Sequence, residues 1–315
     1  MNYDALLLVS FGGPEGMDDV IPFLENVLRG RNVPRERMLS VAKHYEMFAG
    51  VSPINQQNRN LIAALQAELE RNGPRLPIYW GNRNWHPLLI DTVGRMMNDG
   101  VRNALAFVTS AYSSYSSCRQ YLENIADAQA QVGPDAPRIE KLRPFYDHPL
   151  FIEANVAHVR AALEQARDAQ LVFTAHSIPE SMAANCDYAM QLAETAGLIV
   201  RELNIKNWQL VYQSRSGSPM QPWLGPDISE HLKTLAAEGA KEVVIAPIGF
   251  VSDHMEIVYD LDFEAQNIAR ELGLKMVRAA TAGTHPSFVK MIRELMLERI
   301  EGTRTGLCAP GCCVS

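Results

Sequence analysis

The chain has 315 residues, of which 47% are hydrophobic and 21% are charged, and its formal net charge is -7. This composition is typical of a globular protein long enough for two domains, and the negative charge argues against nucleic acid as a main partner. No apolar run reaches the roughly 18 residues of a transmembrane helix, and the first residues show no signal peptide. We therefore expect a cytoplasmic protein without a transmembrane segment.

Short runs rich in Val, Ile and Leu alternate along the chain with longer amphipathic stretches. The runs, which predict buried strands, are 5–11, 76–81, 104–112, 171–177, 209–214 and 242–250. Segments 58–73 and 228–240 are typical of the helices between them. This alternation predicts an α/β fold with parallel sheets that carry helices on both faces.

The two halves of the chain resemble one another. Segment 103–125 is followed by His148-Pro149, and segment 241–263 is followed by His285-Pro286, 137 residues further on. "LLLVSFGGPE" and "LVFTAHSIPE" also both end a predicted strand with Pro-Glu. We predict two similar domains, residues 1–150 and 151–303, that face one another across a cleft, followed by a cysteine-rich tail, 304–315. Chance similarity between α/β units is the alternative.

Chemistry-bearing residues are expected where the predicted strands end, because open parallel sheets bind ligands outside the carboxyl ends of their strands. Gly12 and Gly13 follow the first strand, but without a G-x-G-x-x-G pattern they support nucleotide binding only weakly. His176 ends the first strand of the second half. A lone histidine at a strand end is more often a structural hydrogen-bonding residue than a catalyst.

Acidic residues recur every four positions in "FVSDHMEIVYDLDFE" (250–264), directly after the last predicted strand. They are Glu256, Asp260 and Glu264, with His254 just ahead. On a helix, this spacing places the three carboxylates in one stripe, where like charges repel. A solvated face is the ordinary interpretation, but no Lys or Arg lies between positions 252 and 267. Carboxylates and a histidine at a strand end suit a divalent cation or a proton relay.

Several linked motifs resemble those of the ferrochelatases, the enzymes that insert Fe²⁺ into a porphyrin. They are "SFGGPE", "AGVSPIN", "NRNWHP", "FTAHSIPESM", "VYQSRSGSPMQPWLGP" and "PIGFVSDHMEIVYDLD", in this order. Their combination is specific and reaches from the first strand to about residue 300. The resemblance implies two Rossmann-like domains around a porphyrin cleft, with porphyrin and Fe²⁺ as substrates and transient contacts with neighbouring enzymes of haem biosynthesis.

The resemblance also assigns roles within the second half. His176 matches the catalytic histidine of the family and Glu256 its catalytic glutamate, and the two are expected on opposite sides of the bound macrocycle. Asp260 and Glu264 complete a path, with His176 and Glu256, along which metal or protons move. His254 matches a position that supports the site by hydrogen bonding.

Further positions match segments that contact the porphyrin in relatives. Phe11 and Trp223 are expected as apolar walls. The residues expected around the mouth of the cleft are Arg29, Arg31, Tyr45, Ser52 and Tyr112. For the two arginines, an ordinary solvated surface position is equally compatible with the sequence.

The segment 29–37, "RGRNVPRER", bears on the choice of porphyrin. Relatives that act on protoporphyrin IX at membranes carry a longer, apolar segment in this region. A charged entrance suits coproporphyrin III, which has four carboxylates where protoporphyrin IX has two. We therefore predict a coproporphyrin III ferrochelatase, with protoporphyrin IX as the alternative substrate.

Cysteines gather at the end of the chain. Some relatives bind a [2Fe–2S] cluster through C-terminal cysteines and an internal one, and such a cluster takes four thiolates. The resemblance implies Cys118, Cys308, Cys312 and Cys313 as these ligands. Cys186 is the competing internal candidate. A zinc site with the same ligands, or a tail of ordinary thiols, are the alternatives.

Two other functions remain open at this point. A porphyrin or haem carrier would have the same cleft without catalysis, but it has no need of a proton acceptor beside an acidic stripe. A chelatase for another metal, such as cobalt, is disfavoured by the long "HSIPESM" and "PWLGP" motifs.

Overall fold

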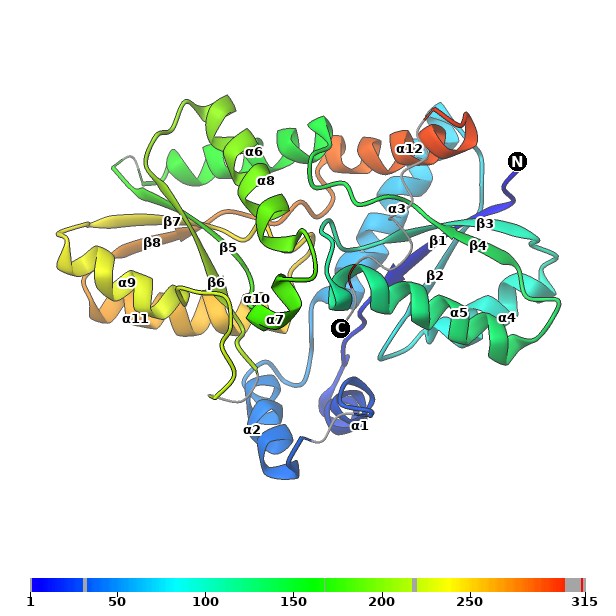
Figure 1. Ribbon diagram of the computed structural model, residues 1–315, viewed down its shortest axis with the longest axis horizontal. Helices are drawn as coiled ribbons and strands as arrows, with labels where there is room; N and C mark the ends of the chain where they lie inside the picture. The colour runs from blue at the N-terminus through cyan, green and yellow to red at the C-terminus, as the bar shows by residue number, and fades with distance from the viewer. Residues whose placement is uncertain (1, 31–32, 167, 217–219, 304–312, 314–315) are drawn as a thin grey trace. The chain divides into compact units, whose positions relative to one another are not determined.

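The computed structural model of the chain describes residues 2–30, 33–166, 168–216, 220–303 and 313 (Figure 1). The chain forms two compact units. Unit 1 contains Met1–Thr109, Gln120–Arg143 and the stretch that begins at Ile292. Unit 2 contains Ser110–Arg119, Pro144–Met291 and Cys313.

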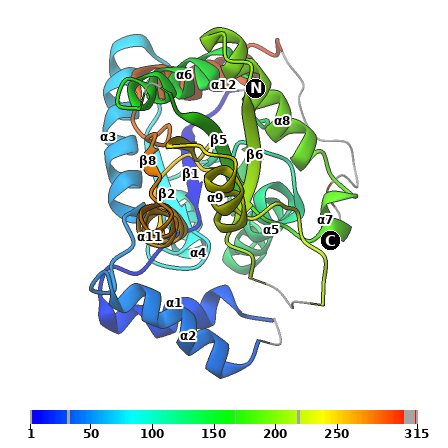
Figure 2. The same cartoon turned by 90° about the vertical axis from the view of Figure 1, so that its left-hand side faces the viewer.

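Unit 1 is built on a four-stranded parallel sheet with the strand order β2-β1-β3-β4. Its strands are β1 (Ala5–Ser10), β2 (Ile78–Asn82), β3 (Asn103–Val108) and β4 (Arg138–Lys141). Helices α4 (Leu89–Asn98) and α5 (Gln120–Val132) pack against one face of this sheet. Helix α3 (Ile54–Asn72) runs along the other face (Figures 1 and 2). Helices α1 (Met17–Val27) and α2 (Arg35–Glu46) complete the unit.

Unit 2 repeats this arrangement with a second four-stranded parallel sheet, in the order β6-β5-β7-β8. Its strands are β5 (Gln170–His176), β6 (Trp208–Gln213), β7 (Glu242–Ala246) and β8 (Lys275–Arg278). Helices α6 (Pro149–Leu163) and α8 (Tyr188–Leu203) cover one face. The other face is covered by α9 (Ile228–Ala237), by η2 (Val258–Ala265), which is a π-helix, and by α11 (Gln266–Glu271) (Figure 1). The equal strand order confirms two similar Rossmann-like domains.

The central strands read as continuous apolar runs because both of their faces are covered. All six residues of β1, "ALLLVS", are buried. Helix starts follow local capping rules. The Asp227 carboxylate accepts a hydrogen bond from the Ser229 backbone N–H at 2.8 Å and caps α9, while His148 caps α6 just before Pro149.

The sequence patterns did not predict two of the strands. β4 reads "RIEK" and β8 reads "KMVR", and each lies at the edge of its sheet. Edge strands are shorter and more polar than central ones because one side is not paired. Neither segment therefore shows the apolar run by which the other strands were recognised.

The compact units do not coincide with the predicted domains 1–150 and 151–303. One reason is the segment Ser110–Arg119, which belongs to unit 2. The other is helix α12 (Pro286–Ile300), whose last turns belong to unit 1 although the helix follows the second sheet in sequence. Within unit 1, Arg143 binds Glu298 at 2.7 Å and Arg299 binds Glu140. These ion pairs attach the end of α12 to the end of β4.

None of the helices in the described part of the chain has the length and hydropathy that a membrane span requires.

Candidate active site

The candidate site lies in unit 2, where the strand order changes direction. β5 pairs with β6 on one side and with β7 on the other, which makes its carboxyl end a switch point where open sheets bind ligands. His176 is the last residue of β5. The loop after β7 passes beside this strand, and its Gly249 N–H donates to the Thr174 carbonyl at 3.0 Å. A Cβ on Gly249 would lie 2.5 Å from the Ala175 Cα, so a larger residue would push the loop away.

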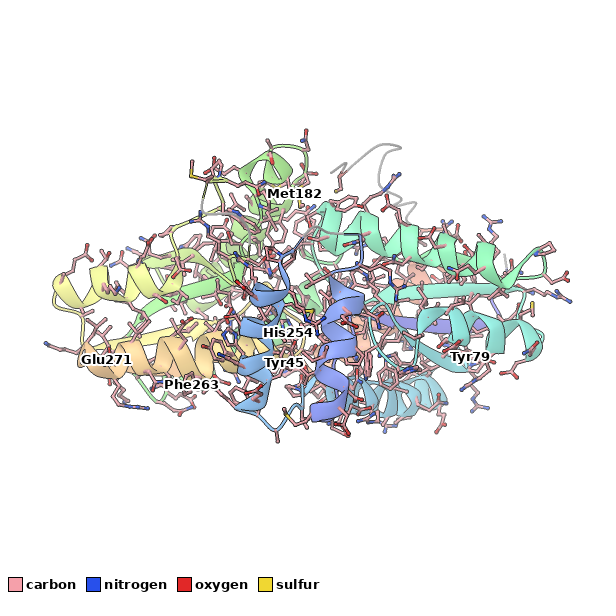
Figure 3. The ribbon with its side chains drawn as sticks, turned by 90° about the horizontal axis from the view of Figure 1, so that it is seen from below. Tyr45, Tyr79, Met182, His254, Phe263 and Glu271 are labelled. Atoms are coloured by element: carbon pink, nitrogen blue, oxygen red, sulfur yellow. The ribbon has the colours of Figure 1, made fainter. Side chains whose placement is uncertain are left out.

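Glu256 reaches His176 from a short helix, α10 (Met255–Ile257), that follows this loop. His254 caps the helix: its Nδ1 accepts a hydrogen bond from the Glu256 N–H at 3.2 Å. Figure 3 labels His254, just before α10 in sequence, and Phe263, which lies on η2. The cap holds the backbone of Glu256 in place.

His176 and Glu256 form an ion pair with Nε2 and Oε1 3.4 Å apart. The other ring nitrogen of His176, Nδ1, donates to the Ser177 carbonyl. This second bond leaves Nε2 as the nitrogen that exchanges a proton with the site. The two side chains are 30% and 43% exposed, so the pair borders solvent.

Each partner changes the pKa of the other. Burial lowers the pKa of His176, but the charge and hydrogen bond of Glu256 outweigh it and raise this pKa to about 9. For Glu256, burial raises the pKa, but the imidazolium of His176 outweighs burial and lowers it to about 2. The pair is therefore charged at neutral pH. Burial lowers the pKa of His254, so that its Nδ1 stays available as a cap.

Asp260 behaves differently from Glu256. Burial raises its pKa to about 7, against a hydrogen bond from Ser214 and together with the negative charges of Glu256 and Glu264. The pKa of Glu264 is also raised, first by burial and then by Asp227. A carboxyl group with a pKa near neutrality exchanges protons readily at physiological pH. The pKa values therefore differ along the stripe: Glu256 is ionised at neutral pH, whereas Asp260 is readily protonated.

Asp260 and Glu264 lie on the π-helix η2, where the sequence predicted an α-helix. A π-helix has wider turns than an α-helix, is rare, and often marks a functional site. Its apolar side, which includes Leu261 and Ala265, packs into the core of unit 2. The unusual helix thus keeps its acidic residues away from that core.

The predicted placement of His176 and Glu256 on opposite sides of a macrocycle is wrong. Their side chains touch each other, and a planar ring inserted between them would need about twice this separation.

Two supporting residues were not singled out from the sequence. Gln213 Nε2 donates to the Glu256 carbonyl at 2.8 Å, and Ser214 Oγ donates to the Asp260 carboxylate. Ser214 has φ 62°, in the left-handed region that costs a non-glycine residue roughly 1–2 kcal/mol. Both lie in the motif "VYQSRSGS", whose polar residues at the end of a buried strand were the available signal.

Trp223 lies beside the segment that follows His176. It pairs with Pro179 in a short antiparallel bridge, and the Leu224 N–H donates to the Ile178 carbonyl at 3.0 Å. Its buried Nε1–H has no hydrogen-bond partner among the described residues. This contact joins the motifs "HSIPESM" and "PWLGP", although its role as a porphyrin wall stays a prediction.

The predicted mouth residues of unit 1 have different surroundings. Phe11 is 37% exposed, whereas Tyr45 is buried, and both rings pack edge-on against Phe23. Ser52 is also buried, because it packs against Gly13, where a Cβ would lie 2.7 Å from the Ser52 Cβ. Phe11 alone of these three offers a large exposed face.

The structure describes one of the two predicted mouth arginines. Arg29 is exposed and binds the Asn26 side chain. Arg31 lies outside the described residues.

Tyr112 falls in unit 2 and is 2% exposed. Its hydroxyl donates to the Ile248 carbonyl at 2.9 Å. The residue therefore packs inside the protein, and its predicted place at the porphyrin mouth stays a prediction.

Of the predicted cluster ligands, Cys118 and Cys313 are described. Both are buried and belong to unit 2, and Cys118 lies on a second π-helix, η1 (Tyr115–Arg119). Cys308 and Cys312 lie outside the described residues. Cys186 is only partly buried, and its thiol donates to the Met182 carbonyl at 3.3 Å. Within the described ranges, no group of three or more His, Cys, Asp or Glu side chains has the arrangement of a metal site.

The fold and the site together define a class of protein. Solved structures of metal chelatases share the architecture: SirB from Bacillus subtilis with Fe³⁺ aligns with a TM-score of 0.59 over 95% of this chain and 98% of that one, at 12% identity. The SirB structure in complex with cobalt, from B. subtilis subspecies spizizenii, aligns with a TM-score of 0.57 over 96% and 97%, also at 12% identity. At these identities the likeness shows the fold alone.

Sequence comparison gives the family. The family model for ferrochelatases matches residues 3–300. A ferrochelatase of Rhodopirellula baltica is 56% identical over 95% of this chain and 86% of its own length. A coproporphyrin III ferrochelatase of Nocardia farcinica is 50% identical over 99% of this chain and 97% of its own. The chain belongs to the ferrochelatase family, and it is a metal chelatase of porphyrin and haem biosynthesis.

Proposed function

We propose that this ferrochelatase inserts Fe²⁺ into coproporphyrin III, and that His176 and Glu256 are its catalytic residues. The observation that carries the choice of porphyrin is the basic, exposed surface at the start of α2. Arg35 and Arg37 are exposed in the first turn of α2, on either side of the exposed Glu36, and Lys43 follows on the same helix. Arg29 is exposed just after α1. Four carboxylates on the substrate gain more from this charge than two. The relatives named as coproporphyrin III ferrochelatases support the same choice.

Porphyrin metalation replaces two pyrrole protons with one dication, so the site must accept two protons. In the resting pair, His176 already carries a proton, because the charge of Glu256 holds its pKa near 9. Fe²⁺ close to Glu256 would neutralise that charge and lower the pKa of His176. His176 then releases its proton and becomes able to take one from a pyrrole nitrogen.

Asp260 is the group that we propose as the next proton acceptor. Its pKa of about 7 suits a residue that takes a proton from His176 and passes it to solvent. Repeating the cycle removes the second pyrrole proton. Glu264, whose pKa is also raised and whose side chain lies further along η2, extends the path outward.

Anaerobic turnover of both porphyrins tests the substrate. We expect kcat/KM for coproporphyrin III to exceed that for protoporphyrin IX at least about tenfold, with insertion followed by the Soret band. Arg35→Gln together with Arg37→Gln should reduce this preference, whereas Arg102→Gln, an exposed arginine elsewhere in unit 1, should not. Equal rates for the two porphyrins in the wild type would contradict the proposed substrate.

We also propose a [2Fe–2S] cluster held by Cys118, Cys308, Cys312 and Cys313. The two described members support it, because both thiols are buried within one unit and four thiolates are the donor set of such a cluster. When bound, the cluster would join segments far apart in the chain and so stabilise the fold. Iron and acid-labile sulfide determination after anaerobic purification tests this, and zinc in their place would identify the alternative metal.

The proposed location is the cytoplasm, where reduced cysteines remain available as ligands. Neighbouring enzymes of haem biosynthesis are the proposed transient partners, since the substrate and product must pass between enzymes. Cell fractionation and crosslinking in intact cells test these two proposals.

A further inference from the structure

One buried tyrosine, Tyr112, connects the cysteine-bearing segment of unit 2 with the loop before Glu256 and with the end of β5 at His176. Tyr112 belongs to segment Ser110–Arg119, which follows β3 in sequence but packs in unit 2. The same segment carries Cys118.

The first connection runs to the loop that precedes Glu256. The Tyr112 hydroxyl donates to the Ile248 carbonyl at 2.9 Å. Ile248 adjoins Gly249, the residue whose close contact with β5 positions this loop. Burial raises the pKa of Tyr112, so that the hydroxyl remains a proton donor. Loss of this bond would leave a carbonyl of the loop without its tyrosine donor.

The second connection runs to His176 itself. The rings of Tyr112 and Tyr188 pack edge-on with centroids 5.9 Å apart. The Tyr188 hydroxyl donates to the His176 carbonyl at 3.0 Å. Tyr112 thus contacts the loop directly and the end of β5 through one intermediate side chain.

The third connection fixes Tyr112 within the cysteine-bearing segment. The Ser117 Oγ donates to the Tyr112 carbonyl at 2.9 Å, and Ser117 precedes Cys118. One residue after Tyr112, Ser113 exchanges two hydrogen bonds with the Gln191 side chain, at 2.8 and 3.1 Å. Gln191 lies on α8, one turn beyond Tyr188. The conformation of η1 and the orientation of Tyr112 are therefore linked.

We propose that Tyr112 is a positioning residue that holds His176 and the loop before Glu256 in register, and that it transmits the conformation around Cys118 to this pair. The proposal rests on the proposed catalytic roles of His176 and Glu256. A catalytic group displaced by about 1 Å can cost a hundredfold in rate, so small shifts of this backbone are sufficient.

Tyr112→Phe tests the proposal because it keeps the ring and removes only the hydroxyl. We expect kcat for Fe²⁺ insertion to fall about tenfold, less than a full 1 Å displacement would cost, while KM for porphyrin and for Fe²⁺ stays within about twofold. Tyr79→Phe is the matched control. Tyr79 is a buried tyrosine of unit 1 whose hydroxyl donates to Asp99 at 2.8 Å, so it loses a similar bond without touching the site.

A spectroscopic measurement tests the link to Cys118 without turnover. In the purified full-length protein, the NMR signal of the His176 imidazole, assigned by its loss in His176→Ala, should shift in Tyr112→Phe and in Cys118→Ser. It should not shift in Tyr79→Phe. In a double-mutant cycle, Cys118→Ser should lower kcat less in the Tyr112→Phe background than in the wild type.

Wild-type kcat in Tyr112→Phe, or additive effects of the two substitutions, would overturn the proposal. If Tyr112→Phe does not fold, Ser117→Ala provides a second test, because it removes the bond to the Tyr112 carbonyl together with the contact between the Ser117 and Ser114 hydroxyls. We expect a smaller loss of kcat, about threefold, with the same His176 shift. A wild type that inserts no iron would instead defeat the proposed function.

Discussion

The His176 Nε2 atom lies 3.4 Å from Glu256 Oε1, although the two residues come from different elements and are far apart in sequence. The contact exists because the loop after β7 crosses the end of β5 at Gly249. It makes each residue the main electrostatic partner of the other, and the consequences can be measured.

His176→Ala should nearly abolish iron insertion and leave porphyrin binding measurable. The substitution removes the proton acceptor, whereas the rest of the site keeps its backbone. Turnover followed by the Soret band, with porphyrin affinity measured by fluorescence quenching, separates the two effects. A variant that turns over near the wild-type rate would show that another group accepts the protons.

Glu256→Gln should lower kcat at least about a hundredfold, the scale expected of a positioned acid–base group. It should also lower the pKa of His176 from about 9, because the charge that raises this pKa is gone. NMR titration of the imidazole measures the change directly. An unchanged pKa would mean that the ion pair is not the cause of the shift.

The same pair predicts a pH dependence of stability. The pKa of His176 is raised from 6.5, so its contribution is complete below about pH 6.5 and is lost as the pH rises through about 9. The pKa of Glu256 is lowered from 4.5, so its contribution is complete above about pH 4.5 and is lost as the pH falls through about 2. The difference in unfolding free energy between the wild type and Glu256→Gln should therefore peak between pH 4.5 and 6.5. Urea denaturation at several pH values measures it, with Glu271→Gln, an exposed carboxylate of α11, as the control.

Asp260→Asn combined with Glu264→Gln should raise KM for Fe²⁺ more than KM for porphyrin, because the stripe is proposed to guide the metal. The variant should also be slightly more stable, since like charges at this spacing repel. The pKa of Asp260 is raised from 3.8 to about 7, so ionisation costs stability increasingly above pH 3.8. The gain in stability should thus be larger at pH 8 than at pH 4. If the dependence of the rate on Fe²⁺ is unchanged, the acidic stripe is an ordinary solvated helix face.

Ser214 allows backbone strain and hydrogen bonding to be separated. Ser214→Ala and Ser214→Gly both remove the donor to Asp260, so both should raise KM for Fe²⁺. Only glycine accommodates the left-handed backbone at φ 62°, so the glycine variant should be more stable than the alanine variant by about 1 kcal/mol. Iron kinetics and urea denaturation measure the two effects. Equal stabilities would argue against strain at this position.

Cys118→Ser should remove the visible absorption of the proposed cluster and lower stability, because a cluster that closes a long chain segment constrains the unfolded state. Cys186→Ser is the control and should keep the absorption, since the Cys186 thiol already donates to the Met182 carbonyl. Absorption spectra and iron content after anaerobic purification measure both. An iron-free, colourless wild type would leave the tail cysteines as ordinary thiols.

Local sequence patterns predict the central strands, the two similar domains and the family of this protein. Buried runs such as "ALLLVS" identified the central strands, because a parallel sheet covered on both faces needs apolar residues at every position. The repeated strand order was anticipated from the similarity of the two halves. Linked motifs such as "HSIPESM" and "SDHMEIVYDLD" identified the family and the candidate catalytic residues His176 and Glu256.

Other features depended on contacts between residues distant in the chain, which no local pattern encodes. The end of α12 belongs to unit 1 because Arg143 and Glu140 bind it there. Tyr112, which the sequence placed only at the mouth of the cleft, donates its hydroxyl to the Ile248 carbonyl, 136 residues away in the chain. The pairing of His176 with Glu256, and the opposite shifts of their pKa values, arise only when β5 and the loop after β7 meet, since electrostatic coupling depends on distance in space rather than in sequence.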